Sequence, residues 1–164
     1  MSRATMIVLT LLCCSPGLGC GEDEVPCAGE GIIEPGVGVG AGGQAICLGE
    51  GAAALEARLG MATRSQDLGA LGRRVEYDKL KVTLLLGGTS GALSLKAMYI
   101  GSGSTLKTAG GVGLGSSEAE IKAALGEPVK DPFLGAWWYP KKGITLQMEA
   151  GKVVAIQLTA AASK

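Results

Sequence analysis

Apolar residues occupy every second position in the segments 144–148 and 154–158, with polar or small residues between them. This period of two is typical of half-buried strands. The stretch Ala-Gly-Lys at 150–152 predicts a turn between them, and the aromatic run 136–139 also has strong strand propensity. Together these segments predict a three-stranded antiparallel meander with one apolar face.

A short helix is predicted just before this meander, over about 118–125. Ser117 and Glu120 have the spacing of a capping box, in which each side chain satisfies a backbone N–H of the other residue. Gly126 favours the left-handed conformation that ends a helix. A helix of two turns is unstable alone, so we expect it to cover the apolar face of the meander.

A fainter copy of this pattern lies upstream, at an offset near 66 residues. A helix predicted over about 52–59 corresponds to the downstream helix. Farther along, the offset falls to 62, and Tyr77 corresponds to Tyr139. Chance could produce any single match, but the agreement in the order of elements favours duplication.

The upstream segment predicts a loop through Gly72 and then three strands, near 73–77, 81–86 and 92–100, followed by a short extra strand or linker at 105–108. The predicted fold class is therefore α+β. It consists of two tandem repeats, each a short helix followed by an antiparallel β-meander, and the two meanders could join edge to edge into one sheet. The first repeat covers 44–108 and the second covers 109–160.

The N-terminus has the pattern of a secretory signal over residues 1–19. Arg3 supplies the positive start, and the apolar stretch that follows is shorter than the ~20 residues needed to span a bilayer. The sequence Gly-Leu-Gly-Cys at 17–20 resembles a bacterial lipobox, although Gly17 departs from the usual Leu. We favour a lipoprotein with acyl chains such as palmitate on Cys20; the alternative is ordinary cleavage before a free or paired Cys20.

Residues 20–43 have the composition of a flexible Gly-rich and acidic tether. The segment 38–43 satisfies the pattern G-x-G-x-x-G, but a nucleotide-binding loop needs a strand before it and a helix after it. Neither is predicted here, so a tether is favoured over a nucleotide site.

Charge and composition exclude several classes of function. The chain has 15 basic and 15 acidic residues, and removal of Arg3 with the signal leaves 14 basic residues. Near-neutral charge argues against nucleic-acid binding. The chain has no histidine, which excludes Ser-His-Asp and Cys-His catalysis and weakens any case for zinc. We therefore expect no enzyme activity, no cofactor, no metal and no small-molecule substrate.

Besides Cys20, two cysteines remain after removal of the predicted signal: Cys27 in the tether and Cys47 in the first repeat. In an oxidising compartment they could form a disulfide. Alternatively, Cys47 lies between two aliphatic residues and could be a small buried core residue. The sequence leaves these alternatives open.

The aromatic residues are the partner-binding candidates: Trp137, Trp138, Tyr139 and Tyr77. Adjacent residues on a strand point to opposite faces, so one tryptophan is expected in the core and the other at the surface. An exposed Trp often anchors a protein–protein contact. Alternatively, the upstream copy covers the outer tryptophan.

The motifs Leu-Gly-Glu-Pro at 125–128, Asp-Pro-Phe at 131–133 and Trp-Tyr at 138–139 form a series. This series resembles the SmpA/OmlA family of small outer-membrane lipoproteins, which take part in β-barrel assembly. The chain is also similar to the tandem-repeat fold of the β-lactamase inhibitory protein. The resemblance covers 112–158 well and 46–100 weakly, and it differs from the assembly lipoproteins in having two units.

The resemblance implies a non-catalytic lipoprotein of the bacterial envelope, anchored by lipid to the outer membrane and facing the periplasm. Its expected role is to bind an envelope protein, in a scaffold or assembly function. The alternative is a proteinaceous inhibitor of a secreted or periplasmic hydrolase that clamps its target with the sheet.

Overall fold

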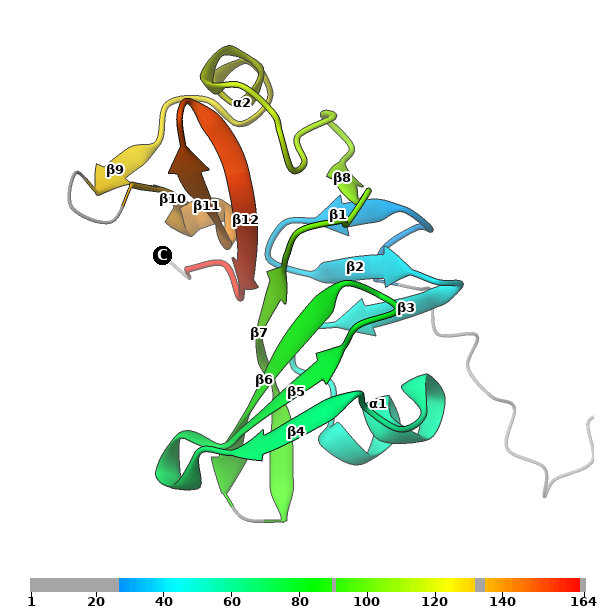
Figure 1. Cartoon of the computed structure of the whole chain (residues 1–164). Coiled ribbons are helices and arrows are strands. Elements are labelled where there is room, and N and C mark those ends of the chain that lie inside the picture. Colours follow the sequence, from blue (N-terminus) through cyan, green and yellow to red (C-terminus); the bar gives the residue numbers. More distant parts are fainter. Residues whose placement is uncertain (1–26, 90, 132–134, 163–164) are drawn as a thin grey trace, which may run out of the picture.

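The computed structural model describes residues 27–89, 91–131 and 135–162, which form two β-sheets and two short α-helices (Figure 1). The small sheet consists of β1 (Ile32–Glu34), β2 (Gly38–Ala41), β3 (Gln44–Cys47) and β8 (Lys107–Thr108). The large sheet consists of β4 (Arg64–Asp67), β5 (Arg73–Tyr77), β6 (Val82–Thr89), β7 (Ala92–Ile100), β9 (Val129–Asp131), β10 (Ala136–Tyr139), β11 (Ile144–Glu149) and β12 (Lys152–Thr159). The helices are α1 (Ala52–Leu59) and α2 (Glu118–Leu125), with two short 3₁₀ helices, η1 (Gly69–Leu71) and η2 (Pro140–Lys142).

The strand order is β3-β2-β1-β8 in the small sheet and β4-β5-β6-β7-β12-β11-β10-β9 in the large sheet. The predicted fold class, two tandem repeats of a helix and a meander in an α+β fold, is wrong. Strands account for 48% of the described structure and helices for 17%, so the protein is mostly β. The error arose because the prediction assigned no strand to 27–43, to 64–67 or to 129–131, where short strands form.

Two rows of inward-facing side chains cross the large sheet and form most of its core. The first row is Val75, Leu84, Met98, Leu158, Ile144 and Tyr139. The second row is Tyr77, Val82, Ile100, Ile156, Leu146 and Trp137. All twelve are buried, because every second residue of a strand points to the same face. The predicted strands form as β11 and β12, and the alternation holds for Ile144, Leu146, Ile156 and Leu158. It is wrong at Val154, which is 39% exposed while Val153 is buried, because the register between β11 and β12 shifts between Gln147 and Met148.

Both α-helices form where the sequence predicts them. At α2 the capping box is present: Ser117 N donates to Glu120 Oε2 at 2.7 Å, and Glu120 N donates to the Ser117 hydroxyl at 3.5 Å. Helix α1 has Gly51 at its N-cap position and therefore no side-chain cap. The helices bury Leu55 and Ile121 in the same apolar cluster as the inward rows, which satisfies the need of two-turn helices to dock.

Residues 27–43, which were predicted to be part of a flexible tether, contain strands β1 and β2. The rest of the predicted tether, 20–26, lies outside the described residues. Each of the first three strands buries one large apolar side chain completely: Ile33, Val39 and Ile46. Glycine in β2 permits close backbone contact, since a Cβ at Gly40 would overlap the carbonyl of Gly29. The glycines that suggested flexibility therefore allow tight packing.

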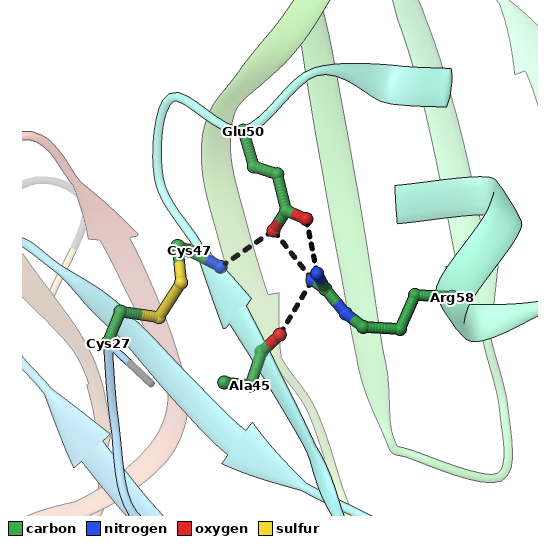
Figure 2. Close-up of a disulfide and its surroundings, with 5 residues drawn as sticks. All are labelled: Cys27, Ala45, Cys47, Glu50 and Arg58. Carbon is green, nitrogen blue, oxygen red and sulfur yellow. Dashed lines mark hydrogen bonds and ion pairs between the residues drawn. A yellow bond between two sulfur atoms is a disulfide. The ribbon is translucent and has the colours of Figure 1, made fainter. Parts of the chain in front are cut away.

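A disulfide joins Cys27, which precedes β1, to Cys47, which ends β3; their Cα atoms are 5.8 Å apart (Figure 2). Of the two alternatives for Cys47, the disulfide is therefore correct. The bond closes a segment of 20 residues that contains β1, β2 and β3. Closing such a loop stabilises the folded chain mainly by restricting the unfolded one.

The free edge of β3 is capped by an ion pair (Figure 2). Arg58 of α1 binds Glu50 at 2.6 Å and donates to the carbonyl of Ala45 at 2.7 Å. Glu50 accepts from Cys47 N at 3.4 Å, and its own N–H donates to Cys47 O. The pair thus occupies backbone groups that could otherwise pair with another strand, and it ties α1 to the small sheet.

Candidate protein-binding face

One outward-facing residue from each of the eight strands falls on a single line across the large sheet. In spatial order these residues are Arg64, Glu76, Thr83, Tyr99, Gln157, Thr145, Trp138 and Val129. None of the eight is buried. We call this line the outer row; it lies on the face opposite the two buried rows.

Three large apolar or aromatic side chains of the outer row are exposed to solvent. Tyr99 is 39% exposed, Trp138 is 43% exposed and Val129 is 57% exposed. Trp138 and Val129 are direct cross-strand neighbours. Tyr99 lies three strands from Trp138, which corresponds to ~14 Å at the usual strand spacing. Aromatic side chains are enriched at protein interfaces, so this part of the outer row is a candidate contact surface.

The opposite end of the outer row is charged. Glu76 accepts both Arg74, at 2.9 Å, and Arg64, at 3.4 Å. The side chains of Arg64 and Arg74 are 74% and 51% exposed. Two guanidinium groups therefore share one carboxylate in a solvent-accessible position.

The structure divides the predicted partner-binding residues between the two faces. Trp138 is on the outer row and is 43% exposed. The alternative, in which the upstream segment covers this tryptophan, is therefore wrong. Trp137, Tyr139 and Tyr77 are only 5%, 6% and 5% exposed, so they are core residues and do not belong to the candidate contact surface. The expectation that the two adjacent tryptophans face opposite ways is confirmed.

The buried aromatic residues hold neighbouring elements in place. Tyr77 and Tyr139 donate their hydroxyl protons to the carbonyls of Gly60 and Gly126, the residues that end α1 and α2. Burial, and secondarily the charge of Glu127, raises the pKa of Tyr139 to about 12. Burial, followed by the charge of Glu56, also raises the pKa of Tyr77. Both hydroxyls therefore stay protonated and keep donating throughout the physiological pH range.

Sequence reasoning missed two of the three exposed apolar or aromatic residues of the outer row, Tyr99 and Val129. Tyr99 alternates with the aliphatic residues Met98 and Ile100 in a segment that was predicted as a strand, so its outward direction could have been inferred. Val129 belongs to β9, a three-residue strand without an alternating pattern. Nothing local marks this strand, since it forms by pairing with β10.

A hollow of about 700 Å³ lies between the start of α1 and the end of the β6–β7 hairpin. Its charged lining residues are Glu56, Asp67 and Arg73, and the first and last of these form an ion pair. The Nε atom of Arg73 is buried without a hydrogen-bond partner. Its described lining residues include no Ser, Thr, Cys or Lys.

Within the described ranges, no group of three or more Cys, Asp or Glu residues could hold a metal ion. The same part of the chain has no helix long and apolar enough to cross a membrane. The predicted signal at 1–19 and the predicted lipid site at Cys20 lie outside the described residues, so both stay predictions.

Comparison with known proteins gives no match to this chain, whether with family models, with curated proteins or with solved structures. The resemblance to the small outer-membrane lipoproteins therefore stays a prediction, and the function is argued from the outer row.

Proposed function

We propose that this chain is a non-catalytic envelope lipoprotein that binds a protein partner through the outer row of its large sheet. The observation that carries the proposal is the exposure of Trp138, Tyr99 and Val129 on one line of a sheet whose other face is buried. A sheet with a packed reverse face is a rigid platform, and rigid aromatic anchors are the residues that most often dominate binding energy.

Other features support an envelope location. A disulfide between Cys27 and Cys47 is typical of exported proteins, since cytosolic thiols are kept reduced. The signal pattern at 1–19 and the lipobox-like sequence ending at Cys20 favour a lipid anchor. Gly21, rather than Asp, follows Cys20 and argues against retention in the inner membrane, so we place the anchor in the outer membrane, facing the periplasm. Replacing Cys20 with Ser should move the protein from the membrane fraction to the soluble fraction; membrane retention of C20S would rule out the lipid anchor.

The proposal is tested by crosslinking in native envelopes, with the full chain and its outer-row variants. Trp138→Ala and Tyr99→Ala should each reduce the crosslinked partner by about 10-fold or more, because truncation of a central interface aromatic costs ~2 kcal/mol. The matched control is Leu71→Ala, since Leu71 is 76% exposed and lies off the outer row. Unchanged partner recovery in both aromatic variants would overturn the proposal.

The identity of the recovered protein separates the two candidate functions. Components of the barrel-assembly machinery would favour an assembly or scaffold role. A secreted or periplasmic hydrolase would favour the inhibitor function, and its activity should then fall when the purified chain is added.

A further inference from the structure

The two ends of the outer row have different chemistry. The end at β4 and β5 carries Arg64, Arg74 and Glu76, whereas the end at β10 and β9 carries Trp138 and Val129. The four middle strands carry no charged residue in the row: they contribute Thr83, Tyr99, Gln157 and Thr145. A partner that covers the whole row must therefore satisfy charge at one end and bury apolar surface at the other.

The charged end has an excess of positive charge. One carboxylate, Glu76, is shared by two guanidinium groups, and each guanidinium has five N–H donors. The donors that do not reach Glu76 suit a second carboxylate, which arginine can bind in a bidentate manner. A carboxylate from a partner would complete a cluster of two guanidinium groups and two carboxylates.

Neighbouring charges do not cancel this excess. The turn after β5 carries Asp78 together with Lys79 and Lys81, so it adds no net negative charge. Asp131 faces the same side of the sheet but lies on β9, seven strands or ~34 Å from β4. That distance is several times the Debye length of ~8 Å at physiological salt.

The spacing of the row sets the footprint of the partner. Glu76 and Tyr99 are two strands apart and Tyr99 and Trp138 are three strands apart, which correspond to ~10 Å and ~14 Å. Thr83, between the first pair, offers a hydroxyl group. An acidic side chain and an apolar side chain on one continuous protein surface can span these distances.

We infer, on the basis of the proposed function, that the outer row binds an acidic protein surface, with a carboxylate at Arg64 and Arg74 and an apolar side chain between Tyr99 and Trp138. A second copy of this chain fits the charged end poorly, because Glu76 is already shared by two arginines and Asp131, on the same side of the sheet, already takes part in another interaction. The occupant is therefore a different protein.

The defined probe is an array of immobilised 15-residue peptides in four composition classes: acidic with aromatic, basic with aromatic, acidic alone and aromatic alone. The full mature chain, kept in detergent, should bind the first class about 10-fold more strongly than the other three. This preference should weaken between 50 and 300 mM salt, since exposed ion pairs are screened. Equal binding to the acidic and basic aromatic classes would overturn the inference.

The variant that isolates the charged end is Arg64→Gln with Arg74→Gln, two exposed positions where Gln keeps much of the side-chain length. It should lose the preference for acidic peptides and bind the crosslinked envelope partner about 10-fold less. Lys141→Gln with Lys142→Gln removes the same charge from η2 and should change neither. Thermal unfolding checks that each variant is folded.

The two proposals fail in different ways. If Trp138→Ala abolishes partner recovery but the double Arg variant does not weaken it, the inference about acidic chemistry is wrong and the outer row still binds a partner. If neither variant has an effect, the proposed function is wrong. Concentration-dependent dimerisation of the wild-type chain by sedimentation, lost in Trp138→Ala, would identify a second copy as the occupant and overturn the inference.

Discussion

The two sheets of this protein are held together by different means. The large sheet buries two rows of six side chains, most of them aliphatic. In the small sheet, β1, β2 and β3 each bury one large side chain completely, and the rest of its cohesion comes from close glycine backbone and the Cys27–Cys47 disulfide. A sheet with little side-chain area can therefore be stabilised by a crosslink and by backbone proximity.

The two sheets nevertheless share one apolar cluster, which contains residues of both, for example Ile33 and Leu146. The chain that leaves β3 also pairs with β7, since Gly49 N donates to Leu95 O at 2.8 Å. We therefore expect one cooperative unfolding transition. The difference between the sheets should appear in the kind of change that each one tolerates.

The largest effect is expected where the large sheet depends on side-chain volume. Leu146→Ala leaves a cavity at a residue that is 0% exposed and should lower the free energy of unfolding by about 4 kcal/mol. Urea titration measures this loss. Its neighbour Thr145 points to the opposite face, so Thr145→Ala should change stability by no more than ~0.5 kcal/mol. Similar losses in both variants would contradict the inward and outward assignment.

The next largest effect is expected at the disulfide of the small sheet. Replacing both Cys27 and Cys47 with Ser should cost about 3 kcal/mol, the entropy expected for closing a loop of this length. Hydrogen exchange should accelerate in 28–47 more than in β6, β7 and β12, because the crosslink acts on the small sheet. Uniform acceleration across both sheets would show that the disulfide does not act locally.

The same difference explains which elements could be predicted from sequence. Strand β11 and the 156–158 part of β12 have an alternating pattern that reflects one buried face, and helix α2 has a complete capping box. The small sheet has neither signal, and its glycines resemble those of a flexible linker. Only the tertiary structure shows that Gly40 lies against the Gly29 backbone.

The candidate site could be predicted only in part, because local patterns give the direction of a side chain but not what covers it. The alternation rule placed Trp137 and Trp138 on opposite faces but gave no information about which face was covered. The outer row also depends on the registers of seven strand pairs, which bring Arg64 and Trp138 onto one line from positions 74 residues apart. Such registers are set by packing across the whole sheet.

A smaller effect is expected at the ion pair that ties α1 to the small sheet. Glu50→Gln removes the charge that binds Arg58 at 2.6 Å and should cost about 1.5 kcal/mol, as for hydrogen bonds to charged groups. The double variant with Arg58→Gln should cost less than the sum of the single variants. Additive losses would mean that Glu50 and Arg58 stabilise the chain independently. Weak self-association of the variants, detected by sedimentation, would indicate that the β3 edge has become accessible.

The smallest effect is expected at α2, whose start depends on a local cap and on the large sheet. Val153 N donates to Ser116 O at 3.0 Å, so β12 holds the residue before the cap even without the Ser117 side chain. Ser117→Ala should therefore cost only about 1 kcal/mol, a typical N-cap loss, measured by urea titration. A loss as large as that of Leu146→Ala would mean that the cap, rather than packing, holds α2 in place.

The pH dependence of the cap provides a second measurement. The backbone N–H of Ser117, and then its hydroxyl, lower the pKa of Glu120 below its ordinary value of 4.5. Because the folded pKa is lower than the unfolded one, this contribution to stability is present above pH 4.5 and is lost as the pH falls through the lowered pKa. In Ser117→Ala the backbone donor remains and the hydroxyl is gone, so NMR titration should find the pKa of Glu120 only partly restored. A pKa unchanged from wild type would mean that the hydroxyl contributes nothing to the cap, and that the backbone N–H alone stabilises the carboxylate.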